Sequence, residues 1–498
     1  MVGNPPWEEI TVEELAFYAR YQPGLRGLAE TERRAELERL LDRRPELRQG
    51  YEAELEQAVA LRAFFGAEPS YLGGAGDPDL YKLFCQRYRA VLRAGGSLAV
   101  VLPRSAFLAK GSTGFREWLF EESTVERLDF LLNNRLWIFA THPQYTVALL
   151  TATASRPAAG HELEVAGVAR SAADFVRQSS APGLRLAAEA LGPGREVPLL
   201  PSQAAADLLA RLRATGPFAL GGGRWRCFPV REFDETNDRR LWSGATDGDP
   251  LWKGESFERY SPHGAGARLC PRTDDALLKA RKPRPGGGSL AAASAPVAER
   301  AAAVGAELEH ARVAFRDVAR ATDSRTVIAA LVPPHVFLTN KAPYLTFLDG
   351  GDLGRAACLA VMNSLPFDWQ ARRFVETNLN FFVLEGLRVP ALDDATFRAV
   401  AHASARLSCV DERFAAFAES VGVEHGPLER EERERLLVEV DALVGRAWGL
   451  TSHDLDVVFA DFTLDAVPEA YRERLRGRLD ELTLEAEPRR ASPVGQQA

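Results

Sequence analysis

The 498-residue sequence lacks a long apolar run, a paired cysteine motif and an excess of positive charge. No uninterrupted apolar stretch approaches the roughly 18 residues that a membrane-spanning helix needs. The first residues show no basic segment followed by an apolar one. The five cysteines form no Cys-x-x-Cys pair, which argues against a zinc site or a disulfide framework. These absences favour a protein of the reducing cytoplasm with no membrane segment and no structural metal.

The net charge of −8 argues mildly against a protein coated in nucleic acid, although local clusters of Lys and Arg decide such binding. A chain of this length has room for two to four domains, and no internal repeat is apparent.

The most informative stretch lies in the first ten residues, where Asn4, Pro5, Pro6 and Trp7 follow one another. The exocyclic amine of adenine is a poor nucleophile because its lone pair is delocalised into the ring. The Asn4 side-chain carbonyl and the Pro5 main-chain carbonyl could accept its two N–H bonds and favour a tetrahedral nitrogen in the transition state. The two prolines would keep those carbonyls aimed. Trp7 offers a flat face on which an extruded base can stack.

The same four residues also suit a rigid turn after a strand, so the motif alone does not decide between a turn and a catalytic site.

Hydrophobic patterning predicts an α/β arrangement after this motif. Two amphipathic helices broken near Pro45 are expected within 28–66 as an insertion, for which packing beside the sheet is favoured over a partner-binding arm. Ser97 to Leu102 is a continuous apolar run, typical of a parallel strand that is buried on both faces. The other predicted elements nearby are helices at 79–94 and 115–120 and strands at 125–132 and 145–152.

Two later clusters carry charge that suggests chemistry. The most basic run of the chain, Arg281, Lys282 and Arg284, ends a stretch from 259 that contains few carboxylates, and it suits either a phosphate-binding loop or a solvated linker. Asp234, Glu235 and Asp238 lie close together, but no acidic-x-Lys pair follows them on a strand. A loop with satisfied carboxylates is therefore favoured over a metal-dependent nuclease.

In the Asn-Pro-Pro-aromatic motif and in several later segments, the chain resembles the later part of an adenine-N6 DNA methyltransferase. The resemblance is to the type IIG restriction–modification and phage-exclusion kind. The resemblance runs in patches from residue 1 to about 465. Besides Asn4–Trp7, it is carried by the segments 79–84, 102–107, 137–145, 231–238, 249–260, 314–326, 359–368 and 378–390. It implies part of a class I (Rossmann-like) methyltransferase sheet with a reversed last strand, an α+β target-recognition region and a helical C-terminal cap.

The resemblance also implies roles for particular residues. Phe139 is expected to form a second stacking face opposite Trp7, although a loop aromatic tucked under the sheet is an equal alternative. Arg316, Arg325 and Asn340 are expected to contact double-stranded DNA, unless they hold the fold together. S-adenosylmethionine is the implied methyl donor, and no metal is implied.

Family members place a glycine-rich cofactor loop before the Asn-Pro-Pro-aromatic motif, and this sequence contains none there. We therefore expect the chain to be the downstream part of a larger or split enzyme. Its cofactor-binding half would then be supplied from upstream or separately, and the chain alone should not methylate. An inactive DNA-binding or specificity module is the alternative.

The expected organisation has five parts. They are half of the catalytic domain at 1–155, a linker and DNA-facing region at 156–300 with a basic loop at 259–284, a target-recognition domain at 301–390, a helical region at 391–482 and a disordered tail at 483–498, with a break at 286–300.

Overall fold

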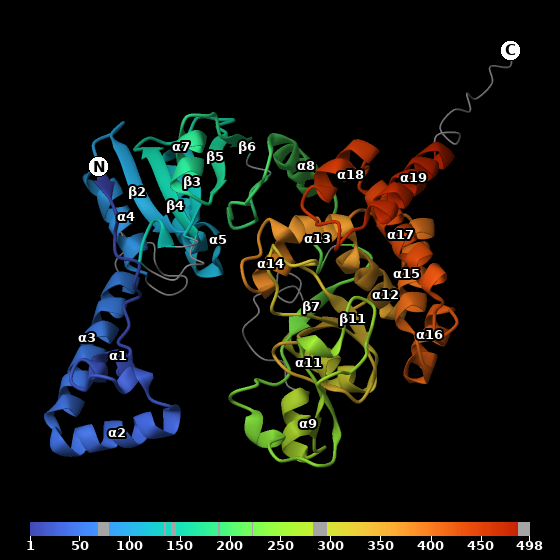
Figure 1. The fold of residues 1–498 in the computed structure, drawn as a ribbon, viewed down its shortest axis with the longest axis horizontal. Coiled ribbons are helices and arrows are strands. Elements are labelled where there is room, and N and C mark those ends of the chain that lie inside the picture. Colours follow the sequence, from blue (N-terminus) through green and yellow to red (C-terminus); the bar gives the residue numbers. More distant parts are fainter. Residues whose placement is uncertain are drawn as a thin grey trace. The chain divides into compact units, whose positions relative to one another are not determined.

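The computed structural model describes residues 1–67, 79–133, 136–140, 146–187, 190–221, 223–281 and 296–486. The chain forms two compact units, Met1–Gln203 and Ala204–Ala498. The fold is mixed α/β, with several sheets and many helices (Figure 1). Within the described ranges, no helix is long and apolar enough to cross a membrane.

The first unit contains a six-stranded sheet of order β1-β2-β4-β3-β5-β6. Its strands are β1 (Val2–Gly3), β2 (Ser97–Pro103), β3 (Thr124–Leu132), β4 (Thr146–Thr153), β5 (Leu163–Ala169) and β6 (Leu184–Leu186). β1 is parallel to β2, and β4 lies between β2 and β3 and runs antiparallel to both. The carboxyl ends of β1, β2 and β3 therefore meet at one edge of the sheet.

Strands were expected at 97–102, 125–132 and 145–152, and β2, β3 and β4 confirm them. The prediction that β2 is buried on both faces is only partly right. Leu98, Val100 and Leu102 are buried, whereas Ala99 and Val101 are partly exposed. One face of β2 is thus packed more closely than the other.

Helices surround this sheet and also form a group of their own (Figure 1). The helices of the first unit are α1 (Glu14–Ala19), α2 (Glu30–Arg43), α3 (Glu46–Ala67), α4 (Leu80–Val91), α5 (Ser105–Leu108), α6 (Thr113–Glu122) and α7 (Ala172–Ser179). The break predicted near Pro45 lies between α2 and α3. We call α1, α2 and the first half of α3 the helical group.

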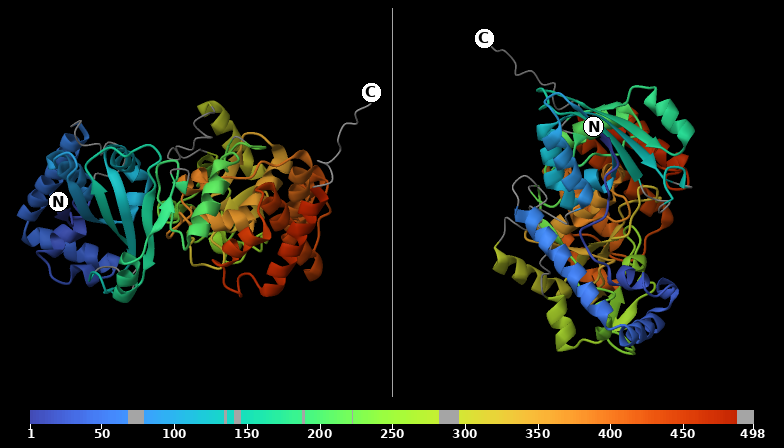
Figure 2. Two further views of the ribbon diagram at one scale, coloured as in Figure 1. Left: turned by 90° about the horizontal axis from the view of Figure 1, so that it is seen from above. Right: turned by 90° about the vertical axis from the view of Figure 1, so that its left-hand side faces the viewer.

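The helical group has a small core that is separate from the sheet. This core is formed by Phe17, Tyr18, Leu25, Leu40 and Leu47. Farther along α3, Ala58 and Phe65 pack with Leu83 of α4, so this end of the helix reaches the helix layer beside the sheet. The right-hand view of Figure 2 shows α3 along its length, as a long blue helix.

The expected catalytic-domain boundary at 155 is too early. β5 pairs with β3 in parallel, and β6 pairs with β5, so residues 163–186 continue the sheet of the first unit. The Ala-, Gly- and Arg-rich composition after 153 concealed these strands, because β6 has only three residues and β5 contains no long apolar run.

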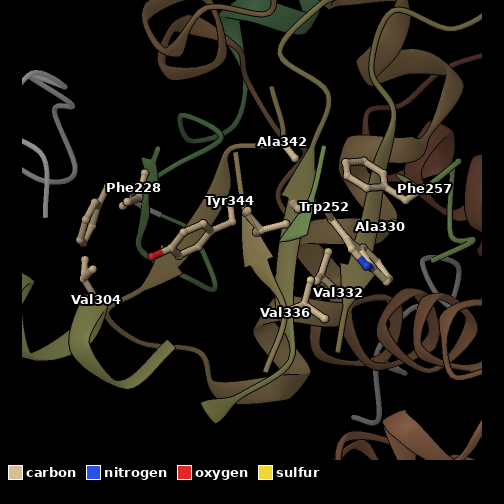
Figure 3. Packing of buried hydrophobic residues seen from close by; sticks show 12 residues of the cluster. Phe228, Trp252, Phe257, Val304, Ala330, Val332, Val336, Ala342 and Tyr344 are labelled. Carbon is tan, nitrogen blue, oxygen red and sulfur yellow. The ribbon is translucent and has the colours of Figure 1, made fainter. Parts of the chain in front are cut away.

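The second unit contains two small sheets, of order β11-β10-β13-β7 and β12-β8-β9. Their strands are β7 (Cys227–Val230), β8 (Asp249–Trp252), β9 (Arg268–Cys270), β10 (Arg312–Phe315), β11 (Ala329–Val332), β12 (Phe337–Leu338) and β13 (Tyr344–Phe347). Trp252, Phe257, Phe228 and Tyr344 are among the large side chains of a core that draws on both sheets (Figure 3).

These pairings also cross the expected boundary at 300. β7 pairs with β13, and β8 pairs with β12, so residues on both sides of 300 build the same sheets. Of the break expected at 286–300, residues 286–295 lie outside the described residues. The last residues of that range belong to α11 (Val297–Ala306).

Helices form much of the rest of the second unit, and those after residue 391 agree with the helical region predicted at 391–482. Besides α11, this unit contains α8 (Gln203–Ala214), α9 (Asp274–Ala280), α12 (Gly351–Asn363), α13 (Leu365–Arg372), α14 (Phe381–Gly386), α15 (Asp394–Ser408), α16 (Ala415–Val421), α17 (Arg430–Ala447), α18 (Ser452–Phe459) and α19 (Glu469–Ala486). The start expected for the tail, at 483, is too early, because α19 continues to Ala486. The residues beyond it lie outside the described ranges.

Candidate functional site

The Asn4–Trp7 segment directly follows β1 at the edge of the first sheet. Val2 and Gly3 pair with Ala99 and Val100 of β2. A Cβ atom at Gly3 would lie 3.1 Å from the Tyr88 hydroxyl of α4, so the strand approaches that helix closely. The chain therefore leaves the sheet at Asn4 from an anchored position.

The segment is anchored again just after Trp7. The Leu80 N–H donates a hydrogen bond to the Glu8 carbonyl at 3.0 Å, and Glu9 forms a β-bridge with Asp79. The strand end and the first turn of α4 thus hold the four residues from both sides.

Within this segment, the hydrogen-bond acceptors without a partner among the described residues include the Asn4 side chain and the Pro5 carbonyl. The Asn4 side chain is exposed and makes no hydrogen bond with them, and none of them donates to the Pro5 carbonyl. Pro5 itself is buried. The prolines contribute no N–H, so an incoming donor has no competitor from their backbone.

The structure brings Trp7 and Phe139 together. Their ring centroids are 5.9 Å apart, with an interplanar angle of 81°. Both side chains are partly exposed, and the Trp7 Nε1–H points to the Val101 carbonyl at 3.4 Å. The rings meet edge to face, so they do not form two parallel faces around a free space. The structure therefore places Phe139 beside Trp7, but stacking of a base between them would require the rings to separate.

Asn133, which the sequence patterning did not single out, holds the Phe139 loop. Its Nδ2 donates to the Phe139 carbonyl at 2.9 Å, and its Oδ1 accepts the N–H groups of Ile138 and Phe139 at 3.0 and 3.1 Å. Asn133 is fully buried. A polar residue immediately after a buried strand was the available signal, and Asn133 follows β3 as Asn4 follows β1.

The remainder of the 137–145 segment, residues 141–145 with His142, lies outside the described residues.

The start of α4 carries a buried ion pair. Lys82 Nζ lies 2.7 Å from Asp79 Oδ2 and donates to the Gly111 carbonyl at 2.9 Å. Beside it, burial raises the pKa of Tyr81 above its ordinary value, and its hydroxyl lies 3.2 Å from Ser112 Oγ. These groups satisfy one another and fix α4 against the segment that follows β2.

The expected DNA-binding residues differ in how far they are engaged within the protein. Arg316 Nη2 donates to the Phe257 carbonyl and to Glu258 Oε1, both at 2.6 Å. Asn340 Nδ2 donates to Asp234 at 3.3 Å. These contacts favour the fold-holding alternative.

Arg325 pairs with the buried Asp368 at 3.1 Å, which also favours a fold-holding role. Arg281 is half-exposed and lies 3.5 Å from Glu309. Lys282 and Arg284 lie outside the described residues.

Two of the three carboxylates at 234–238, those of Asp234 and Asp238, are satisfied within the protein, as expected for such a loop. Asp234 Oδ1 accepts the N–H groups of Thr236 and Asn237, and Asp238 pairs with Lys279 at 2.9 Å. Across the part of the chain that the structure describes, no group of three or more His, Cys, Asp or Glu residues is placed to hold a metal ion.

No protein-family model matches the chain, and no curated protein matches it. Solved structures with similarity include the type IIL restriction-modification enzyme MmeI in complex with DNA, at 10% identity and a TM-score of 0.41, over 82% of this chain and 53% of that one. A nuclease-deletion mutant of the type ISP enzyme LlaGI with a DNA substrate mimic gives 9% identity and a TM-score of 0.40, over 82% and 41%.

The type IIG restriction endonuclease BpuSI gives 11% identity and a TM-score of 0.26, over 81% of this chain and 51% of that one. The chain thus spans about half the length, or less, of these restriction-modification enzymes. TM-scores below 0.5 do not establish a common fold.

Proposed function

We propose that this chain carries the target-base half of a site-specific DNA methyltransferase that modifies the N6 amine of adenine, with a role in restriction–modification or phage defence. The observation that carries the proposal is the placement of Asn4–Trp7. Two acceptors without a partner among the described residues and an accessible indole follow a parallel strand at its carboxyl end. In open α/β sheets, ligands bind outside the carboxyl ends of the strands.

The proposed chemistry at this edge uses the chain's own groups. The Asn4 Oδ1 and the Pro5 carbonyl would each accept one N–H bond of the adenine amine. The amine nitrogen would then become more tetrahedral and its lone pair more available for attack, an effect that grows as positive charge develops on it. Trp7 would cover one face of the base, and Asn133 would keep Phe139 close to the other side.

The order of the strands also supports the proposal. β4 is a reversed strand between β2 and β3, which agrees with the sheet end that the sequence resemblance implies. The resemblance likewise supplies double-stranded DNA as the substrate class.

The residues of this chain do not by themselves fit S-adenosylmethionine. The segments that follow β1, β2 and β3 begin with Asn4, Arg104 and Asn133, and none is glycine-rich. The Asp79 carboxylate at the start of α4 is already paired with Lys82. We therefore propose that an upstream or separate polypeptide half supplies most of the cofactor site.

The test is transfer of a labelled methyl group to duplex DNA by the chain together with that cofactor-binding half. Asn4→Ala should lower adenine-N6 methylation by about 100-fold or more, because transition-state contacts of this kind contribute that much. Trp7→Ala should lower it by about tenfold, because stacking of a base on an aromatic side chain is worth about 1–3 kcal/mol. DNA binding should be retained. Gln49→Ala, which removes an exposed amide on α3, is the matched control and should methylate normally. Unchanged methylation by Asn4→Ala would contradict the proposal.

The alternative is a DNA-binding or specificity module without catalysis. The edge-to-face contact of Trp7 and Phe139 favours it, because this arrangement leaves no slot between parallel rings. Under that alternative, the chain binds duplex DNA, and neither Asn4→Ala nor Trp7→Ala changes methylation in any combination with a cofactor-binding half.

A further inference from the structure

A cavity of about 320 Å³ in the second unit is lined by more arginines than carboxylates. Arg259, Arg325, Arg430 and Arg474 line it, together with the single carboxylate Glu434. Its walls come from the first turns of α17 and α19, the start of α13 and the loop that carries Arg259. The helices α17 and α19 direct the positive ends of their dipoles toward this region.

Arg259 is the least compensated of these side chains. No carboxylate lies within 4.0 Å of its guanidinium among the described residues, and its Nη1 donates to the Asn363 carbonyl at 3.2 Å. Arg325 Nη2 donates to the same carbonyl at 2.6 Å, so two guanidinium groups converge on one oxygen at the end of α12. Burial first, and the nearby Arg325 second, lower the pKa of Arg259. An arginine nevertheless keeps its charge in a protein.

The neighbouring carboxylates are already engaged. Asp368 serves Arg325 and Arg372, and Asp441 accepts the Tyr471 hydroxyl and the Leu365 N–H. At the mouth of the cavity, Glu434 is shared by Arg430 and Arg474 at 3.0 and 3.1 Å. The cavity therefore holds more positive than negative charge, and Glu434 occupies the donors that an incoming anion would use.

We propose that this cavity is a binding site for a phosphate group, with Arg259 at its base and Arg430 and Arg474 at its mouth. The planar guanidinium groups match the oxygens of a phosphate and can bind it with paired hydrogen bonds. A phosphate alone fills only part of the volume, and the remaining wall includes Leu365, Leu437 and Val467. The phosphate is therefore carried by a larger group, either a small monoester such as a nucleotide or the backbone of nucleic acid.

The test measures binding of adenosine monophosphate and inorganic phosphate to the full chain by calorimetry, with ionic strength held constant by sodium chloride. Arg259→Gln should weaken binding by at least tenfold, whereas Glu434→Gln should strengthen it several-fold because it frees the two mouth arginines. Arg476→Gln, which alters an arginine of α19 paired with Asp456 outside the cavity, is the control and should bind as the unchanged protein does.

A second arm distinguishes the source of the phosphate. If it belongs to nucleic acid, Arg259→Gln weakens duplex binding and flattens its salt dependence, while adenosine monophosphate competes poorly. If the Arg259→Gln variant does not fold, the change in anion and duplex binding caused by Glu434→Gln is the test. The proposal is overturned if neither anion binding nor duplex binding responds to these substitutions. No methylation is measured, so this result is independent of the function proposed above.

Discussion

In the first unit, the Asn4 side chain at the end of β1 is left accessible, whereas in the second unit polar side chains beside the strands are buried against one another. Asn4 is exposed and has no hydrogen-bond partner among the described residues. By contrast, Arg312 and Glu232 form a fully buried pair at 2.8 Å, and Asp368 accepts from two arginines and two backbone N–H groups.

A polar residue with a functional role can be distinguished from one with a structural role. Both kinds lie beside strands, so their place in the fold does not distinguish them. The difference is whether the protein itself provides their hydrogen-bond partners. A buried polar group without a partner lowers the stability of the fold, whereas an accessible one is hydrated and remains free to bind a ligand. Substitutions should therefore divide into those that affect stability and those that affect only binding or catalysis.

The largest effect is expected for Asp368→Asn. Loss of this charge leaves Arg325 and Arg372 without their buried anion, which should lower the free energy of unfolding by about 3–5 kcal/mol. Chemical denaturation followed by tryptophan fluorescence measures it. Asp456→Asn, in an exposed pair with Arg476, is the control and should leave the midpoint unchanged. Equal losses of stability in the two variants would contradict the prediction that a buried carboxylate contributes more to stability than an exposed one.

Asn133→Ala should have the next largest effect. It removes three hydrogen bonds and leaves the groups of Ile138 and Phe139 unsatisfied, a loss of about 1–3 kcal/mol. The aromatic contact between Trp7 and Phe139 should loosen as well, which an increased accessibility of Trp7 to a fluorescence quencher would report. A variant with normal stability and normal quenching would mean that the loop is held by other contacts.

A smaller, pH-dependent effect is expected at Asp393, which caps α15. The hydrogen bond from the Thr396 N–H is the main cause that lowers the pKa of this carboxyl below its ordinary value. Asp393→Ala should cost about 1 kcal/mol at pH 7.

Because the folded-state pKa of Asp393 is depressed, its stabilisation is present above the unfolded-state pKa of about 3.9 and is lost as the pH falls through the lower folded value. The stability difference between the two proteins should therefore begin to shrink at about pH 4 and decrease further as the pH falls through the lower folded-state pKa. A difference that stays constant between neutral and strongly acidic pH would show that the charge of the cap contributes nothing.

The smallest effect on stability is expected at Asn4, where the comparison is sharpest. Asn4→Ala should change the free energy of unfolding by no more than about 0.5 kcal/mol, because the side chain is exposed and its loss removes no internal contact. The same substitution should lower methylation by about 100-fold or more under the proposed function. A large loss of stability would instead mark Asn4 as part of the turn that ends β1.

The sequence allowed α2, α3, β2, β3 and β4 to be predicted, because their apolar patterns and the break at Pro45 are local signals. It did not reveal β5 and β6, because their apolar runs are short and lie in a stretch of loop-like composition. It also misplaced the boundaries at 155 and 300, since strand pairing between distant segments leaves no local trace.

At the site, the proximity of Trp7 and Phe139 could be predicted only through family resemblance, and their edge-to-face geometry could not be predicted at all. The roles of Arg316, Arg325 and Asn340 depend on partners far away in the sequence. Arg325, for example, meets Asp368 across 43 positions. Charge patterning identifies such residues but not the groups that satisfy them.

The separate core of the helical group has a consequence for how the first unit responds to stress. The core of the helical group includes Phe17, Tyr18, Leu40 and Leu47, which pack among themselves. Their contacts can therefore break without the loss of any hydrogen bond between strands. Local opening would then cost far less than global unfolding, and a protease would reach the backbone of α2 while the sheet stays intact. The end of β1 with Asn4, and the loop in which Asn133 holds Phe139, would keep their geometry during such local opening.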